Sequence, residues 1–174
     1  HDADTMGNRF RCLIVPAAKG GGLDQDIVDE FAAEHGLRGL FTPEEAAFIA
    51  NPAPSDRDSI QFSWRYEAAW VLLWALGWGD KTLGLPRETC DVDLIVGTVR
   101  EAPDLTSRTL RTASEVLDEA DLIYRCHWAV RQSDLDGADV PGGFEPGVVM
   151  ERHHALNWLI GYGSDEWDEV STDT

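Results

Sequence analysis

The stretch SIQFSWRYEAAWVLLWALG, Ser59 to Gly77, decides the fold that this sequence predicts. From Ala68 to Leu76 every residue is apolar, so a helix formed here has no polar side to turn toward water. A helix that is apolar all round is buried by its neighbours. The apolar run is about half as long as a membrane-spanning helix must be. We therefore expect residues 59–77 to form a buried central helix of a helical bundle, without membrane association.

Two short helices are expected before this stretch. Residues 23–36 have helical periodicity, with Asp24 as the N-cap and Gly36 as the C-terminal stop. In the next segment Thr42 and Glu45 have the spacing of a capping box, and Pro43 occupies the first helical position. These start signals predict that a helix begins at Pro43.

Further helices are expected after it. Residues 106–132 and 148–162 are each predicted as a long helix, and residues 165–170 as one short turn. The pattern of residues 91–101 is compatible with helix or strand, and we favour helix. The fold class is therefore mainly α, a single-domain bundle comprising residues 23–174.

The N-terminal residues 1–22 are expected to lie outside this bundle. RFRCLIV, Arg9 to Val15, is a short apolar run before Pro16 and predicts a short strand or an ordered arm. The following AAKGGG lacks the residue order of a phosphate-binding loop and is interpreted as a linker.

Composition and charge limit the classes of function. The 174 residues suit one domain, and 43% hydrophobic residues with 7 tryptophans indicate a globular protein. Acids outnumber bases by 32 to 14, for a net charge of −18, which disfavours binding to nucleic-acid phosphates. The same charge would suit a basic protein partner, or simply keep the protein in solution.

The cysteines indicate a reducing compartment. Cys12, Cys90 and Cys126 are odd in number and contain no Cys-x-x-Cys pair, so neither a disulfide framework nor a zinc knuckle is expected. No basic and apolar signal segment precedes the domain. We expect a cytosolic protein with reduced thiols.

The predicted helix 106–132 carries charged groups beside its apolar side. At about 100° per residue, His127 falls within an apolar stripe. The expected stripe consists of Ala113, Val116, Leu117, Ala120, Tyr124 and Trp128. Asp121 and Arg125 lie four residues apart at its edge, in the order that favours an ion pair.

Charged residues on the neighbouring helices suggest that these groups meet. Glu67 shares a helix side with tryptophans, and Arg152 follows Glu151 on a side expected to be half-buried. Because an unpaired buried charge is costly, these groups should pair with Asp121, Arg125 and His127. The cluster has two interpretations. One is a structural network that fixes helix register, and the other is a pocket in which Glu67 or Asp121 acts as a base while an arginine holds an anion.

Neither a metal nor a cofactor is expected. Glu151 and His154 have the Glu-x-x-His spacing of di-iron helix bundles, but that site needs a second copy and two further glutamates. His153 and His154 are adjacent and point about 100° apart, so they cannot readily share one ion. No glycine-rich dinucleotide loop or nucleophile elbow is present.

Four blocks resemble, in this order, a largely bacterial group, the domain-of-unknown-function 4272 family. They are SWRYEAAWVLLWALG, EVLDEADLIYRCHWAV, VVMERHHALNWLIG and WDEVSTDT. The matching positions are Trp64, Arg65, Glu67, Trp74, Asp121, Tyr124, Arg125, His127, Trp128, Glu151, Arg152, Asn157, Trp158, Trp167 and Asp168. The resemblance runs from about residue 36 to residue 174 and departs at RFRCLIVPAAKGGG. It implies a common fold and grouping of these residues.

Two functions remain open at this level. One is a non-catalytic binding or interaction module, which would dock a basic partner. The alternative is a small hydrolase-like enzyme that uses the carboxylate–arginine–histidine cluster. A cleft open to water at Glu67 and Asp121 would favour the enzyme, and a dry, fully paired cluster would favour the module.

Overall fold

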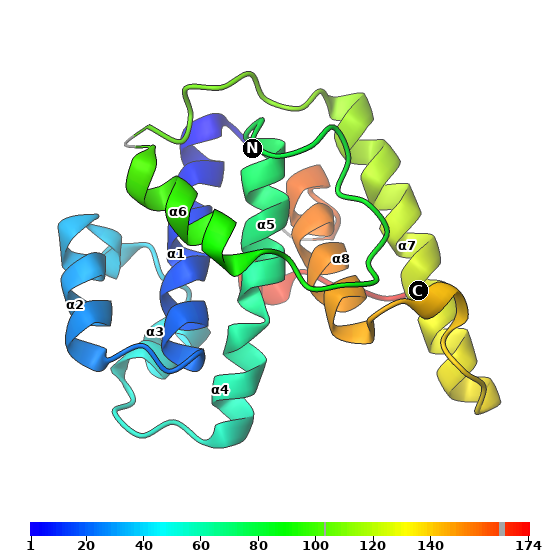
Figure 1. Ribbon diagram of the computed structural model, residues 1–174, viewed down its shortest axis with the longest axis horizontal. Coiled ribbons are helices and arrows are strands. Elements are labelled where there is room, and N and C mark those ends of the chain that lie inside the picture. Colours follow the sequence, from blue (N-terminus) through cyan, green and yellow to red (C-terminus); the bar gives the residue numbers. More distant parts are fainter. Residues whose placement is uncertain (103, 164–165) are drawn as a thin grey trace.

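The computed structural model describes residues 1–102, 104–163 and 166–174, and within these ranges the chain forms helices, turns and loops without a β-strand (Figure 1). The mainly α fold is confirmed. The helices are α1 (Ala3–Gly20), α2 (Gln25–Glu34), α3 (Pro43–Ala50), α4 (Asp56–Ser63), α5 (Arg65–Ala75), α6 (Val92–Glu101), α7 (Ala113–Asp136) and α8 (Pro146–Ile160), with short 3₁₀ turns at Leu37–Gly39, Pro141–Gly143 and Trp167–Glu169. Each of these helices is too short or too polar to cross a bilayer.

The N-terminal residues form a helix of the core, so the expected strand or arm and the expected linker are wrong. Asp2 caps α1, which buries Phe10 and Leu13 and continues through Pro16 to Gly20. A proline inside a helix removes a hydrogen bond and is unfavourable by about 3 kcal/mol. The extensive packing of α1 against α5 supplies stabilisation that the local sequence does not reveal.

The expected central helix consists of two helices that meet at Trp64. Its N-terminal part is α4, which begins at Asp56, and its buried part is α5, which ends at Ala75. At the junction the amide of Glu67 donates to the carbonyl of Trp64 at 2.9 Å, three residues back rather than four. The Trp64 ring packs against the backbone of Gly147. A Cβ at position 147 would lie 2.8 Å from this ring, so glycine gives the ring the space that it needs.

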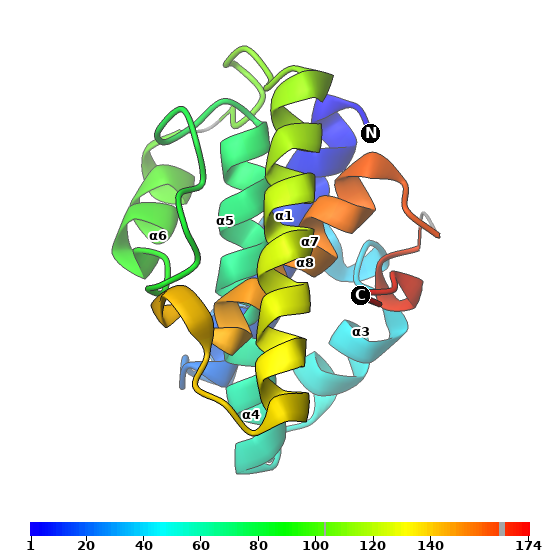
Figure 2. The same ribbon diagram turned by 90° about the vertical axis from the view of Figure 1, so that its right-hand side faces the viewer.

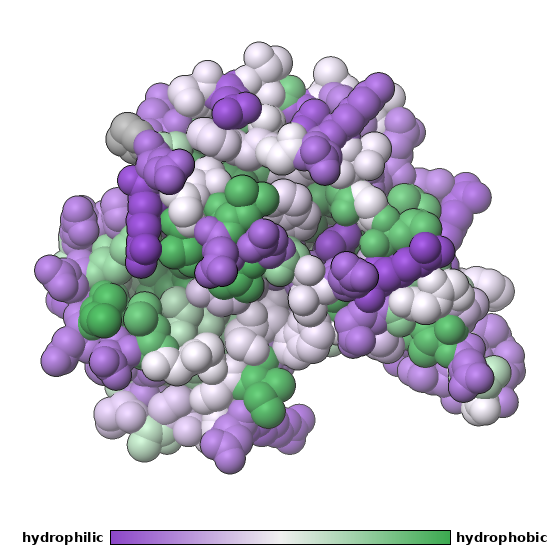
Figure 3. Space-filling view, viewed as in Figure 1, coloured by the Kyte–Doolittle hydropathy of each residue, from purple (hydrophilic) through white to green (hydrophobic). Residues whose placement is uncertain are grey.

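The long helices are arranged in a row. In Figure 1, α1, α5, α8 and α7 follow one another across the molecule. Helix α5 is buried between α1 and α8, as its all-round apolar sequence predicts, and α7 covers the outer side of α8 (Figure 2). On the face shown in Figure 3, hydrophilic residues surround smaller apolar areas.

The start signals in the sequence are largely confirmed. Thr42 and Glu45 form the capping box of α3. Asp24 precedes α2 without a side-chain capping bond, and Gly36 has a φ of 65°, which suits glycine after a helix end. Residues 91–101 are helical, as favoured.

The two later long helices are displaced from their expected bounds. Helix α7 starts after a second capping box, made by Thr112 and Glu115, instead of at residue 106, and it extends to Asp136. Helix α8 begins two residues earlier than expected, at Pro146. The expected turn at 165–170 is the 3₁₀ turn Trp167–Glu169, and Asp165 lies outside the described residues.

Candidate functional site

A buried ion pair joins α5 to α8. Glu67 and Arg152 have side chains that are 2% and 5% exposed, and the Nε of Arg152 donates to the Oε2 of Glu67 at 3.1 Å. The other carboxylate oxygen of Glu67 accepts the backbone N–H of Cys90. The Nη1 of Arg152 donates to the carbonyl of Leu83 at 3.1 Å. The sequence analysis placed Glu67 and Arg152 in one cluster, and the structure brings them together as a buried, hydrogen-bonded pair.

A second ion pair lies beside the first. The Nη1 of Arg65, the first residue of α5, lies 3.2 Å from the Oε2 of Glu151 on α8. Burial raises the pKa of Glu151, and the adjacent Arg65 opposes this effect. The sequence analysis proposed Glu151 for the cluster but named Arg65 only among the positions that match the family, because no local spacing relates residues that are 86 positions apart.

Asp121 and Arg125 do not belong to the buried cluster, contrary to the expectation. They form an ion pair of 2.9 Å within α7, but their side chains are 61% and 73% exposed. The predicted apolar stripe is rotated around α7 relative to the side of the helix that packs inward. The side that packs inward carries Ala120, Ile123 and Val130, and it includes His127, which is buried as expected.

His127 meets His153 of α8, and their hydrogen bonds define a directed chain. The Nδ2 of Asn157 donates to the carbonyl of Ser171 at 2.8 Å, which fixes the orientation of the amide. The same Nδ2 lies 3.1 Å from the Nε2 of His153, so that nitrogen accepts. The proton of neutral His153 is then on Nδ1, which donates to the Nδ1 of His127 at 2.8 Å. The proton of His127 is consequently on its Nε2.

Burial favours the neutral form of both histidines. Burial, together with the neighbouring His127, lowers the pKa of His153 to about 4. Burial and the nearby Arg131 lower the pKa of His127. His154 points elsewhere, with its Nε2 3.0 Å from the carbonyl of Trp167, as the angular separation of adjacent helical residues requires.

Another buried ion pair, which the sequence analysis missed, attaches α1 to α3. The guanidinium of Arg9 contacts the carboxylate of Glu45, the residue that also completes the capping box. The Arg9 guanidinium carbon lies 5.2 Å from the ring centre of Trp167. The sequence analysis assigned residues 9–15 to a strand or an arm. Because the contact depends on Arg9 lying on a helix, it was not predicted.

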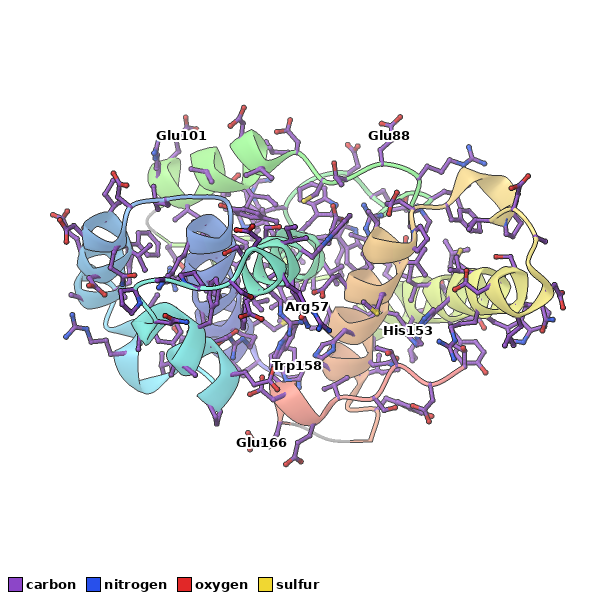
Figure 4. All side chains as sticks on the ribbon, turned by 90° about the horizontal axis from the view of Figure 1, so that it is seen from below. Arg57, Glu88, Glu101, His153, Trp158 and Glu166 are labelled. Carbon is purple, nitrogen blue, oxygen red and sulfur yellow. The ribbon has the colours of Figure 1, made fainter. Side chains whose placement is uncertain are left out.

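A cavity of about 440 Å³ opens beside this ion pair. Its lining combines the ends of α3 and α8 with the C-terminal turn: Arg9, Leu40, Phe41, Thr42, Pro43, Trp158, Glu166, Trp167, Asp168 and Glu169. Figure 4 shows Trp158 and Glu166 on the same side of the molecule, near this turn. The Nε of Arg9 and the Nε1 of Trp167 are buried donors without a hydrogen-bond acceptor in the described part of the chain.

In residues 1–102, 104–163 and 166–174, no three His, Cys, Asp or Glu side chains form a group that could hold a metal ion. The three cysteines are free thiols. Burial raises the pKa of Cys12 to about 11, which keeps it in the unreactive thiol form near neutral pH.

The fold and these contacts define an all-helical domain with buried interhelical ion pairs and an aromatic cavity rimmed by acids. The chain belongs to the family described as Domain of unknown function (DUF4272), whose model matches residues 1–170. The match includes the N-terminal residues that were expected to depart from the family, in agreement with the place of α1 in the core. No curated protein and no solved structure matches the chain.

Proposed function

We propose that the protein is a non-catalytic binding module whose cavity receives a basic peptide segment of a partner protein. The observation that carries the proposal is the composition of the cavity wall. Aromatic rings form part of it, Glu166, Asp168 and Glu169 supply carboxylates, and Arg9 is neutralised by Glu45.

The cavity complements two features of a basic peptide. The N–H groups at the Nε of Arg9 and the Nε1 of Trp167 have no acceptor among the described residues, and a peptide carbonyl would supply one once the cavity wall opens, because both nitrogens are buried. A cationic side chain beside that carbonyl would meet the carboxylates at the rim of the cavity. The buried rings of Trp158 and Trp167, whose centres are 5.5 Å apart, form the wall behind them and are already packed against His1 and Arg9.

The arrangement of the polar cluster supports a module over a hydrolase. Glu67 is fully hydrogen-bonded and excluded from water, so a substrate would have to displace Arg152 or Cys90 to reach it. Asp121, the other carboxylate suggested as a base, is on the outer face of α7. We further propose a cytosolic location, consistent with three free cysteines.

A peptide of alternating arginine and glycine tests the proposal. We expect isothermal titration to show binding that weakens with added salt, and the same peptide with glutamine for arginine to bind far more weakly. In the double variant Glu166→Gln/Glu169→Gln the affinity should fall by about tenfold, which corresponds to about 1.4 kcal/mol.

The control removes the same charge elsewhere. Glu30 and Glu34 lie exposed on α2, and Glu30→Gln/Glu34→Gln should retain nearly the wild-type affinity. Equal weakening in both double variants would contradict the proposal, because binding would then depend only on the overall negative charge. Failure of the wild-type protein to bind the arginine peptide would contradict it as well.

A further inference from the structure

An exposed stripe on α7 has the spacing of a coiled-coil seam. Four of its side chains are large and apolar, and they are Leu117 (54% exposed), Tyr124 (46%), Trp128 (54%) and Leu135 (77%). Asp121 and Arg131 complete the stripe. Together these residues follow one another at intervals of 4, 3, 4, 3 and 4 along the sequence. This is the heptad spacing by which two helices keep one side in contact over several turns.

The stripe is accessible along its length. Figure 2 shows α7 running along the face turned to the viewer, and no other described element lies in front of it. The inner side of α7, which carries Ile123 and Val130, packs in the core. The helix is therefore apolar on two sides, of which the bundle covers one.

The stripe is complementary to itself in the antiparallel direction. When two α7 helices are placed antiparallel about a twofold axis at residue 126, Leu117 lies opposite Leu135 and Tyr124 opposite Trp128. The same operation places Asp121 of each copy opposite Arg131 of the other, because each of these pairs of residue numbers is centred on 126. An isologous interface requires this kind of self-complementarity.

We propose that α7 forms an antiparallel homodimer interface with a second copy of this chain. Apolar contacts between Leu117 and Leu135 and between Tyr124 and Trp128 stabilise it, and the two Asp121–Arg131 pairs set the direction and register. The net charge of −18 makes two copies repel each other at long range. Dimerisation therefore strengthens as salt screens this repulsion, whereas binding of a basic peptide in the cavity weakens with salt.

Charge exchange at two exposed positions tests the interface. Sedimentation equilibrium of the full chain at moderate salt should show a monomer–dimer equilibrium. Asp121→Arg and Arg131→Asp each place like charges opposite one another, and each should raise the dissociation constant by about tenfold or more. The double variant Asp121→Arg/Arg131→Asp restores opposite charges and should return to within about threefold of the wild type.

The double variant also controls for effects within one helix. It loses the Asp121–Arg125 pair just as the single variant Asp121→Arg does, so its recovery separates the contact between copies from the contact within α7. Circular dichroism of each variant serves as the control for folding. A wild-type protein that stays monomeric would overturn the proposal and leave the stripe to a different partner. A dimer that both single variants leave unchanged would overturn it too, because the contact would then lie on another face.

Discussion

At the scale of single residues, the hydrogen bond between His127 and His153 makes a prediction about proton positions. Because Asn157 donates to the Nε2 of His153, neutral His153 carries its proton on Nδ1 and His127 carries its proton on Nε2. Nitrogen-15 NMR of the imidazoles at neutral pH should show these two opposite tautomers. Asn157→Leu removes the donor and should let His153 populate the other tautomer. Identical tautomers for both histidines in the wild type would contradict this order of hydrogen bonds from Asn157 through His153 to His127.

The same pair predicts how stability depends on pH. The pKa of His153 falls from 6.5 to about 4 on folding, so in this interval the unfolded chain binds more protons and stability decreases as the pH decreases. The shift corresponds to at most about 3 kcal/mol. Glu151, whose pKa is raised, acts in the opposite direction, so the wild type must be compared with a histidine variant.

Denaturant unfolding between pH 7 and pH 4 provides that comparison. His153→Gln should flatten the pH dependence of the unfolding free energy, whereas His35→Gln, at an exposed position after α2, should leave it unchanged. Equal slopes in wild type and His153→Gln would show that His153 is not responsible.

At the scale of helices, the ion pairs differ in energy according to burial. Arg152→Met leaves the carboxylate of Glu67 buried without its partner, and this should decrease the unfolding free energy by about 3–5 kcal/mol. Arg125→Met makes the same substitution in the exposed pair with Asp121, where the loss should be about 0–1 kcal/mol. Urea unfolding of both variants gives the two values. Similar losses would contradict the assignment of one pair to the core and the other to the surface.

At the scale of the whole molecule, the net charge of −18 is distributed over a surface whose repulsion salt can screen. The screening length is about 10 Å at 0.1 M salt, while the buried pairs are screened much less. The melting temperature should therefore increase from low to moderate NaCl. The melting temperature is measured at a protein concentration at which the protein is monomeric. A flat or decreasing melting temperature would contradict this account of the surface.

The sequence by itself determined the parts of the protein that depend on local rules. The capping box of α3 needs only Thr42 and Glu45 at the right spacing, and the burial of α5 follows from the absence of any polar side between Ala68 and Leu76. The sequence also predicted a partner for Glu67, because a carboxylate within such a helix requires one. These signals lie within one or two helical turns, so no knowledge of the other helices was needed.

Only the tertiary structure decided which side of α7 faces inward and that residues 3–20 form a helix. Helix α7 is apolar on two sides, one with Tyr124 and Trp128 and one with Ile123 and Val130, and only packing against α8 selects between them. For α1, contact with α5 offsets the unfavourable Pro16. The approach of His153 to His127 likewise depends on how α7 and α8 pack, since residues 26 positions apart have no local spacing that would bring them together.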